Sequence, residues 1–569
     1  MRIVGIHDGH NASVAYIENG CLKFAIQEER LNLIKNYWGF PHTSFDFLLS
    51  KYDLESQDID LIVFSSKYMP KGMDRDRLIE AHNQDNNIYE IFRNLMAEKD
   101  IYKRLTFHRL RRKKLSNTNM EMRRRNLKKY NFSDGKIYFL DHHLSHAAAA
   151  YYGLKYDDDP YLILTLDGGG DSLCATVSIG KNGMIERLSE THQGHSIGNI
   201  YSRITFLMGF VPWEHEYKLM GMAPYANPDR SERVRQMFSS YLDLDDKNPM
   251  SFKRKIPEST TYITKRLEKD IRGLRFDEIC AGLQIFTEDL IVRWVKECIG
   301  ITGIRRVLCS GGVFMNVKAN KRIMELPEVD IISIFPSCGD ETNSIGAAFF
   351  LAYQNKDSVA PLSHFYTGHH FNNEFVEQEI KKTDISWTYF DDIDEKIASL
   401  LADQKIVARC SGAMEFGARA LGNRSILANP SSQDCVRVIN MMVKKRDFWM
   451  PFAPVLRKER MHEYIINPKN IDSPYMMFTF DTTTKRNEFM GAVHNADLTA
   501  RAQIISEEAN PQYYNIIKKF EEKTGMGVLL NTSFNLHGCP IVMGPREAID
   551  VFSKSGLQYL VLENYLLWK

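Results

Sequence analysis

Two histidines in this sequence stand at a spacing that suits a metal ion. His142 and His146 are four positions apart in HHLSHAAAAYYG, an alanine-rich stretch that predicts a helix, so both imidazoles fall on one helix face. Alone, such a pair is more often two helical histidines of no special role. Asp167, which ends an apolar strand before a glycine turn, and Asp340, which begins another expected helix, favour the metal. Two histidines and two aspartates suit iron, zinc or manganese, and ligand type leaves that choice open.

Two glycine turns follow apolar strands and could bind phosphate. Gly168–Gly170 follow YLILTLD, and Gly311–Gly312 follow RRVLCS. Glycine lets backbone N–H groups approach a phosphate closely, and the helix expected after Gly312 adds a positive dipole end. One such turn is weak evidence. Two in one domain, together with a repeated hairpin, predict a two-lobed nucleotide-binding fold.

A third set of residues gathers cationic and polar groups toward the carboxyl end. GARALGNRSIL, VKKRDFWMPFAP, HNADLTARAQ and LLNTSFN interleave arginine and lysine with glycine, proline and aromatic residues, which ordinary surface charge does not explain. Guanidinium groups grip phosphate bidentately, and asparagine and serine after a strand can donate to its oxygens. We therefore predict an anion site. Its candidate residues are Arg419, Arg424, Lys444, Arg446, Arg501, Asn531 and Ser533.

The order of predicted strands and turns along the chain indicates which elements and domains hold these candidate residues. Residues 1–30 predict a hairpin with a turn at Asn19-Gly20. YLILTLDGGGDSLCATVSI repeats the layout, so that Asp8-Gly9 in the first copy corresponds to Asp167-Gly168 in the second. The stretch APLSH, near 359–363, resembles a boundary, which places one domain at 1–360 and another at 365–569.

Residues 66–135 interrupt the first domain and become strongly basic, with RLRRKK and RRR. We interpret them as a basic helical insertion. A solvated surface and a patch for RNA or a partner protein are the two interpretations. The sequence lacks aromatic residues interleaved at regular spacing, which favours the surface.

Composition bounds the class of protein. The chain has 569 residues, and a single core stops growing at roughly 250–300, so two or more domains are expected. A net charge of +1 gives no global attraction to nucleic acid or an anionic membrane. The sequence shows no signal peptide and no apolar run of roughly 18 residues, so we expect a cytoplasmic protein without a membrane partner. Nine scattered cysteines without a C-x-x-C pair favour reduced thiols.

The sequence resembles the NodU/CmcH/TobZ family of O-carbamoyltransferases. The resemblance rests on HHLSHAAAAYY, YKLMGMAPY, CSGGVFMN, CGDETNSIGAA, GARALGNRSIL and LLNTSFN, in this order, and covers nearly the whole chain apart from 66–135. It implies an α/β fold whose N-terminal domain is TsaD-like, with the two lobes of the actin/Hsp70/sugar-kinase superfamily. The C-terminal domain would be a YrdC-like twisted sheet of the α+β kind.

The resemblance also implies an enzyme and a two-step reaction. The YrdC-like domain would join carbamoyl phosphate and ATP, held with Mg²⁺, to give carbamoyl-adenylate and pyrophosphate. The TsaD-like domain would pass the carbamoyl group to a hydroxyl of a sugar, a glycan or a natural product. Among the divalent metals, the resemblance favours iron. A small-molecule or sugar acceptor is the expected partner, nucleic acid is not expected, and a homodimer stays open.

Residue roles carry over only where the motifs match. His10, in DGHNAS, matches the general base, and His142, His146, Asp167 and Asp340 match the metal ligands. The candidates for the first nucleotide site are Gly168, Lys218, Gly311, Gly312 and Asn316. The seven cationic and polar residues named above fall on the matching segments of the ATP and carbamoyl-phosphate site.

One departure and two alternatives accompany this interpretation. The family usually has arginine before PFAP, where this chain has Met450, and Lys445 is the neighbouring cation. A tRNA-modifying TsaD-like enzyme would suit the basic insertion but would not carry the fused C-terminal domain. A non-catalytic nucleotide sensor or RNA-binding protein on an actin-like scaffold would need neither His10 nor a second phosphate site.

Overall fold

A computed structural model describes residues 1–67, 75–83, 106–155 and 157–569 of the chain. These residues form two compact units. Unit 1 comprises Met1–Lys23 and Asn36–Leu362, and unit 2 comprises Phe24–Lys35 and Ser363–Lys569. The short segment Phe24–Lys35 therefore belongs to the second unit although it comes early in the sequence.

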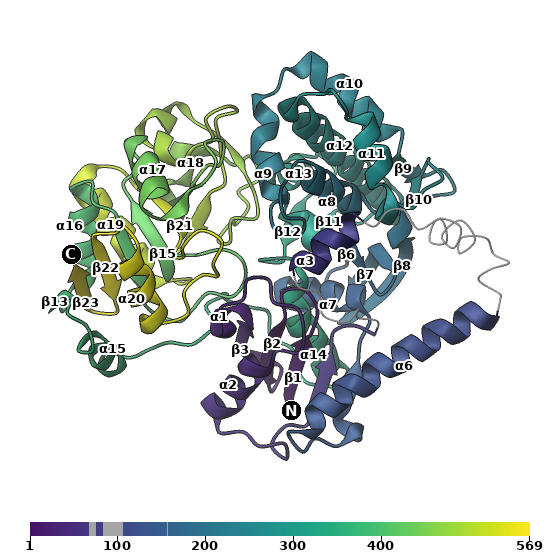
Figure 1. The fold of residues 1–569 in the computed structure, drawn as a ribbon, viewed down its shortest axis with the longest axis horizontal. Coiled ribbons are helices and arrows are strands. Elements are labelled where there is room, and N and C mark those ends of the chain that lie inside the picture. Colours follow the sequence, from purple (N-terminus) through teal and green to yellow (C-terminus); the bar gives the residue numbers. More distant parts are fainter. Residues whose placement is uncertain (68–74, 84–105, 156) are drawn as a thin grey trace. The chain divides into compact units, whose positions relative to one another are not determined.

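The first of two five-stranded sheets has the order β3-β2-β1-β4-β5 (Figure 1). Its strands are β1 Arg2–His7, β2 Ser13–Glu18, β3 Cys21–Gln27, β4 Leu61–Phe64 and β5 Ile137–Phe139. β1 is antiparallel to β2 and parallel to β4, which is parallel to β5. Between β2 and β3, Asn19 and Gly20 have φ values of 51° and 74°, the backbone of the two-residue turn that Asn-Gly favours. The hairpin expected over 1–30 is confirmed.

The second sheet repeats this topology with the order β12-β11-β6-β7-β8. Its strands are β6 Tyr161–Gly170, β7 Leu173–Lys181, β8 Met184–His192, β11 Arg306–Ser310 and β12 Ile331–Ile334. β6 is antiparallel to β7 and parallel to β11, which is parallel to β12. Numbered within its own half, each sheet has the strand order 3-2-1-4-5. The two-lobed α/β fold predicted for the N-terminal part is confirmed.

Two equivalent helices lie between these sheets. α7 (His142–Leu154) follows β5, and α14 (Asn343–Gln354) follows β12. The helices pack on each other, α7 also on β6 and β11, and α14 also on β1 and β2. A Cβ at Gly346 of α14 would lie 1.9 Å from the carbonyl oxygen of Ser145, so glycine is what allows the two helices to touch. This packing brings the amino ends of both helices to the strand ends that carry the polar turns.

The second lobe adds further helices and a small hairpin. They are α8 Ile197–Leu207, α9 Glu216–Met222, α10 Pro228–Ser239, β9 Leu242–Asp245, β10 Asn248–Arg254, α11 Thr264–Asp270, α12 Phe276–Thr302 and α13 Val317–Met324. The long helix α12 packs on α10 and α13. Trp294 of α12 is buried, and its indole N–H donates to the carbonyl oxygen of Met250 at 2.8 Å.

The expected insertion at 66–135 contains the helices α3 (Arg75–Asn83) and α6 (Thr106–Lys128) in its described parts. Residues 68–74 and 84–105, and the side chains of RLRRKK, lie outside the described residues. Near the end of α6, the buried Arg123 donates to both carboxylate oxygens of Asp8, at 2.6 and 2.7 Å. Its guanidinium also donates to the carbonyl oxygen of Ser66 and faces the ring of Phe64. The insertion is thereby tied to the glycine turn that follows β1.

Unit 2 is built on a mixed sheet of eight strands in the order β13-β23-β22-β14-β15-β21-β16-β20. They are β13 Ser386–Tyr389, β14 Val407–Cys410, β15 Arg424–Ala428, β16 Ala453–Arg457, β20 Gln503–Ile505, β21 Val528–Ser533, β22 Tyr559–Leu562 and β23 Tyr565–Trp568. The helices include α15 Asn373–Ile380, α16 Ile393–Ala402, α17 Asp434–Ile439, α19 Pro511–Thr524 and α20 Pro545–Lys554. β14 pairs parallel with β22 and antiparallel with β15. The mixed α and β content expected of this part is confirmed.

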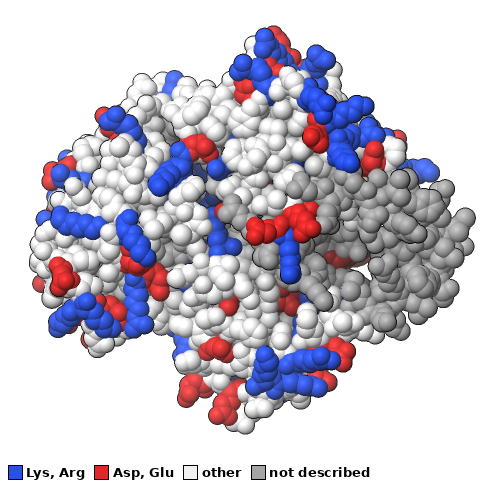
Figure 2. Space-filling view, in the orientation of Figure 1, with Lys and Arg blue, Asp and Glu red and all other residues white. Residues whose placement is uncertain are grey.

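Two further features of the structure are the distribution of charge on its surface and the character of its helices. Figure 2 shows basic and acidic side chains interspersed over much of the face in view. Among the described residues, none of the helices combines the length and the apolar character that crossing a bilayer would demand.

Candidate functional site

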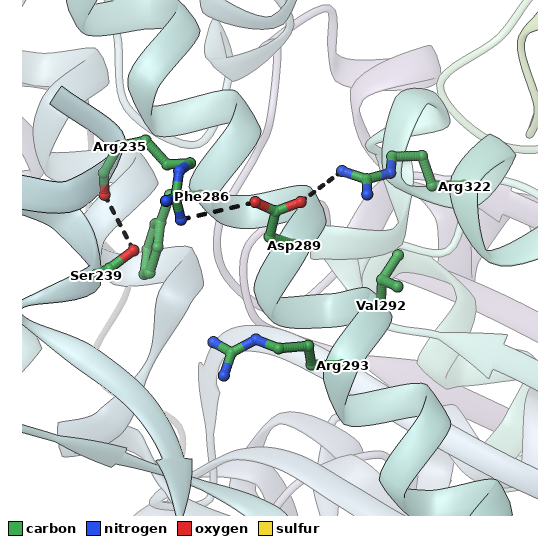
Figure 3. A pocket seen from close by; sticks show the side chains of 7 residues that line it. All are labelled: Arg235, Ser239, Phe286, Asp289, Val292, Arg293 and Arg322. Carbon is green, nitrogen blue, oxygen red and sulfur yellow. Dashed lines mark hydrogen bonds and ion pairs between the residues drawn. The ribbon is translucent and has the colours of Figure 1, made fainter. Parts of the chain in front are cut away.

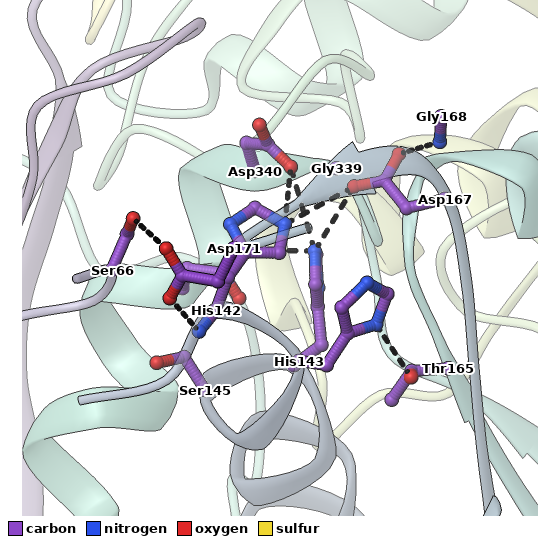
Figure 4. Close-up of polar contacts among 12 residues, drawn as sticks. Ser66, His142, His143, Ser145, Thr165, Asp167, Gly168, Asp171, Gly339 and Asp340 are labelled. Carbon is purple, nitrogen blue, oxygen red and sulfur yellow. Dashed lines mark hydrogen bonds and ion pairs between the residues drawn. The ribbon is translucent and has the colours of Figure 1, made fainter. Parts of the chain in front are cut away.

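Four side chains of unit 1 converge on one point. His142 and His146 come from the first turns of α7, Asp167 from the end of β6, and Asp340 from the turn before α14. One ligand atom from each lies within 4.8 Å of all the others. The Nε2 atoms of His142 and His146 are 3.2 and 3.5 Å from Oδ2 of Asp167, and each is 3.4 Å from Oδ1 of Asp340 (Figure 4). The structure thus brings together all four residues proposed as metal ligands.

Local structure fixes each of these side chains. Asp141 caps α7 by accepting the backbone N–H of Leu144 at 2.9 Å, which sets where the helix begins. A Cβ at Gly170 would lie 2.2 Å from the ring of His142, so this glycine makes the space for the imidazole. The N–H of Gly168 donates to Oδ1 of Asp167 at 2.7 Å.

A further layer of polar groups surrounds the cluster. Nδ1 of His146 is 3.1 Å from the hydroxyl of Ser310, which fixes the ring, and Nε2 faces both the carboxylates and the side-chain amide nitrogen of Asn343, 3.1 Å away. The buried His143 points elsewhere, with Nδ1 2.8 Å from the hydroxyl of Thr165. Asp171 accepts the backbone N–H of His142 at 2.9 Å. The helical spacing therefore selects His142 and His146 and sets His143 aside.

The electrostatics of the cluster favour a cation. Burial alone would lower the pKa of His142, but Asp340 and Asp167 outweigh it and raise that pKa to about 9. Burial would raise the pKa of Asp167, but the two imidazoles hold it well below its usual range. Two carboxylates face two buried imidazole nitrogens, and positive charge between them, either protons or a metal ion, stabilises this arrangement. The donor set of nitrogen and carboxylate oxygen fits a first-row divalent ion.

His7 links this cluster to His10. It ends β1, and its Nε2 lies 3.1 Å from the carbonyl oxygen of His10 and 3.9 Å from Oδ2 of Asp340. Burial lowers the pKa of His7 to about 4, against the attraction of Asp340. The neutral ring accepts from the Ser65 hydroxyl at Nδ1, 2.9 Å away, and donates to the His10 carbonyl through Nε2. Sequence reasoning missed His7, although the spacing of IHDGH could have indicated it.

The structure brings together three of the five residues proposed for the first nucleotide site. Gly168 and Gly311-Gly312 lie together, because β6 and β11 are neighbours and a Cβ at Gly312 would lie 3.2 Å from Oδ1 of Asp167. Asn316 caps α13 and exchanges amide hydrogen bonds of 2.9 and 3.0 Å with Gln284 of α12. Lys218 lies on α9, with Nζ 4.8 Å from the centre of the Phe210 ring.

In unit 2, Lys444 is the best-defined candidate for binding an anion. It is buried, and its ammonium donates to the hydroxyl of Ser533 at 3.0 Å and to Oδ1 of Asn535 at 2.5 Å. Burial, and then repulsion by Arg446 and Lys35, holds the pKa of Lys444 well below its usual range. A buried ammonium facing two further cations gains from a bound anion. Lys35, from the segment Phe24–Lys35, was not foreseen from the sequence.

The other candidates of unit 2 have different surroundings. The buried guanidinium of Arg424 donates to backbone carbonyl oxygens, among them those of Met543 at 2.8 Å and Gly412 at 3.1 Å. Asn531 donates to the carbonyl oxygen of Ala420 at 3.0 Å. Arg446 lies 5.0 Å from the centre of the Phe452 ring, and Arg419, Arg446 and Arg501 are all partly exposed. Met450 N–H donates to the carbonyl of Asp447 in the turn before β16.

A separate cavity of about 420 Å³ lies among α10, α12 and α13 (Figure 3). Its lining residues are Arg235, Ser239, Phe286, Asp289, Val292, Arg293 and Arg322. Asp289 lies between Arg322, at 2.6 Å, and Arg235, at 3.8 Å. Arg293 pairs with Asp243 at 2.7 Å. Each guanidinium thus already faces a carboxylate of the protein.

Comparison with known proteins adds independent information. The family profile described as "Carbamoyltransferase N-terminus" matches residues 2–349, and "Carbamoyltransferase C-terminus" matches residues 398–569. An uncharacterized protein of Methanocaldococcus jannaschii is 31% identical over 100% of this chain and 99% of its own length. The nodulation protein NolNO of Sinorhizobium fredii is 29% identical over 98% of this chain and 79% of its own length. Among solved structures, full-length HypF is 13% identical, covers 63% of this chain and 47% of its own, and has a TM-score of 0.36.

Proposed function

This chain belongs to the carbamoyltransferase family, and from that premise we propose that it is an ATP-dependent O-carbamoyltransferase working through carbamoyl-adenylate. Carbamoyl transfer is the activity of the family. The adenylate and the acceptor, a hydroxyl of a sugar, glycan or natural product, are the further steps of the proposal. The observation that carries it is the convergence of His142, His146, Asp167 and Asp340 in unit 1, together with the burial of Lys444 near other cations in unit 2.

Unit 2 is proposed to make the activated intermediate. Water releases phosphate from carbamoyl phosphate, and an oxygen of the resulting carbamate attacks the α-phosphate of ATP, so that pyrophosphate leaves. Carbamoyl phosphate, the carbamate, ATP and the leaving pyrophosphate are all anionic. A buried ammonium at Lys444, with Arg446 and Lys35 nearby, supplies the compensating charge. Ser533 and Asn535 hold the ammonium in place.

Unit 1 is proposed to transfer the carbamoyl group. The nitrogen of a carbamoyl group donates into its carbonyl and makes it a poor electrophile, whereas AMP is a good leaving group. His10 would take the proton of the acceptor hydroxyl as that oxygen attacks the carbonyl carbon and AMP leaves. A divalent metal held by His142, His146, Asp167 and Asp340 would supply Lewis acidity at this centre.

The first test is pyrophosphate exchange into ATP that depends on carbamoyl phosphate. We expect exchange by the full chain and its loss in Lys444→Ala. His10→Asn should keep the exchange and lose carbamoyl transfer to hydroxylated compounds, detected by mass. Absence of exchange in well-folded, metal-loaded protein would instead support a nucleotide-sensing role.

The second test concerns the metal. Replacing His142 and His146 together by alanine should remove the bound metal, measured by elemental analysis of the purified full chain. Retention of the metal by this variant would contradict the ligand assignment. The same measurement on the unaltered chain decides among iron, zinc and manganese.

A further inference from the structure

The candidate base His10 sits on a loop that pairs with a distant segment. His10 forms an isolated antiparallel bridge with Trp38, and the N–H of Ala12 donates to the carbonyl oxygen of Tyr37 at 3.0 Å. The carbonyl oxygen of His10 accepts a hydrogen bond from Nε2 of His7. The backbone on either side of His10 is therefore held by hydrogen bonds that come from other parts of unit 1.

Two tryptophans surround the side chain of His10. Its ring centre lies 6.0 Å from that of Trp38 and 5.5 Å from that of Trp213, with interplanar angles of 73° and 75°. The two indoles are 5.6 Å apart and tilted by 36°. The imidazole therefore meets both indoles in the edge-to-face arrangement that aromatic rings prefer. We call this group of three rings the aromatic corner.

Trp213 reaches this position through an unusual backbone. Its φ is 64°, a left-handed conformation that bulky side chains rarely adopt. The surrounding turn holds it there: its N–H donates to Oε1 of Glu216 at 2.7 Å, and the N–H of Val211 donates to Nδ1 of His215 at 3.2 Å. Such strain persists where the surroundings fix it, and it concentrates at functional sites.

A buried histidine also packs near Trp213. The ring centre of His82, on α3, lies 5.9 Å from that of Trp213 at an angle of 75°. Its two nitrogens are engaged by the carbonyl oxygen of Leu78 at 2.8 Å and by the hydroxyl of Ser202 at 3.1 Å. The indole of Trp213 thus lies near the rings of His10, Trp38 and His82, and His82 connects it to α3.

We propose that Trp38 and Trp213 are positioning residues that hold the imidazole of His10 in the orientation needed for carbamoyl transfer. An indole has an N–H donor but no site that can accept a proton from the hydroxyl, so the role proposed for both tryptophans is to restrict the ring of the base. The inference rests on the proposed function, because it takes His10 to be the base. It goes further by assigning a role to two residues outside the family's motifs quoted above and to the strained turn at Trp213.

The first experiment tests the placement without relying on activity. The full chain is labelled with [¹³Cε1]histidine, and the signal of His10 is identified by its loss in His10→Asn. An imidazole that lies near two indoles shows a ring-current shift, which we expect to decrease in Trp38→Leu and in Trp213→Leu. An unchanged His10 signal in both variants would overturn the proposed placement.

The second experiment tests the consequence for transfer. The probes are methyl glucoside, methyl mannoside and methyl N-acetylglucosaminide, and the carbamoylated product is followed by mass. In Trp213→Leu we expect kcat for transfer to fall by about 10–100-fold, because a misplaced catalytic group costs about that much. The KM for the glycoside should change by less than about 3-fold. Trp213→Phe, which keeps a ring, should recover most of the rate.

Controls separate this role from general loss of structure and from failure of the proposed function. Trp294→Phe disturbs the core of the same unit far along the chain from His10, and it should lower stability while leaving kcat for transfer unchanged. Exchange of pyrophosphate should stay at its normal level in all these variants. A Trp213→Leu enzyme with normal kcat would refute the positioning role alone. An unaltered chain without exchange and without transfer would overturn the proposed function and this role with it.

Discussion

The charged form of Glu216 lowers the free energy of unfolding, and the variant Glu216→Gln should remove this destabilisation. Burial, with a smaller contribution from Glu214, raises the pKa of Glu216 from 4.5 to about 7, although backbone N–H groups, including that of Trp213, oppose the change. A carboxyl group whose pKa is higher in the folded than in the unfolded state makes its full contribution to stability below its unfolded pKa. That full contribution, present below 4.5, declines progressively as the pH rises and is lost once the pH passes the folded value of about 7.

The size of the effect follows from the two pKa values. The interval from 4.5 to about 7, at about 1.4 kcal/mol for each pKa unit, sets an upper bound of about 3 kcal/mol above pH 7. Glu216 keeps part of its surface exposed, so solvent screening reduces this to about 2 kcal/mol. Glutamine retains a carbonyl oxygen for the Trp213 N–H, so the hydrogen bond survives the change. Glu216→Gln should therefore stabilise unit 1 at pH 8 and have little effect at pH 5.

Calorimetry of the full chain at pH 5 and pH 8 tests this reasoning. For a unit of this size, 1 kcal/mol corresponds to about 1–2 °C, so we expect a rise of about 3 °C at pH 8 and less than about 1 °C at pH 5. The exposed Glu268 of the same unit provides the control, since Glu268→Gln should change neither value. A rise that is equal at both pH values, or a fall at pH 8, would refute the electrostatic explanation.

Three further predictions concern the two candidate sites. Gly170→Ala places a methyl group against the ring of His142, so the purified protein should contain less than half of the normal metal by elemental analysis while staying folded by circular dichroism. Lys444→Met keeps the volume but removes the buried charge, so the full chain should gain thermal stability while pyrophosphate exchange falls by at least about 100-fold; retained exchange would place the anion elsewhere. Gly311→Ala forces a Cβ to within 2.3 Å of the carbonyl oxygen of Leu166 at a φ of 107°, so we expect a loss of about 2–4 kcal/mol in unfolding experiments with urea.

The parts of the fold that could be predicted from the sequence are those that depend on residues close together along the chain. The Asn19-Gly20 turn and the helix from His142 follow from residue types within a few positions of each other, and both are present. The correspondence of Asp8-Gly9 with Asp167-Gly168 indicated the repeat because a strand and a turn recur with the same pattern. The extension of that repeat to β4, β5, β11 and β12 was not visible, since those short strands differ in sequence and in spacing.

Contacts between distant segments account for what the sequence did not show. The left-handed backbone of Trp213 depends on Glu216 and on the packing of His82, and no local pattern encodes it. Arginines in glycine-rich turns look alike in the sequence. In the structure, Arg424 donates to backbone carbonyls, whereas Arg446 stands beside the buried ammonium of Lys444.

The two copies of the repeat each have an aspartate after the first strand, and the two aspartates have different partners. Asp167 faces two imidazoles, while Asp8 is gripped by a guanidinium that reaches it from α6. Deletion of the insertion at 66–135, which would leave only the two repeated halves, would remove the counter-charge of Asp8. A buried carboxylate without a partner costs several kcal/mol. Any shortened enzyme would have to neutralise Asp8 in the same operation, for example by Asp8→Asn. The basic segment is thus a structural component of the first lobe.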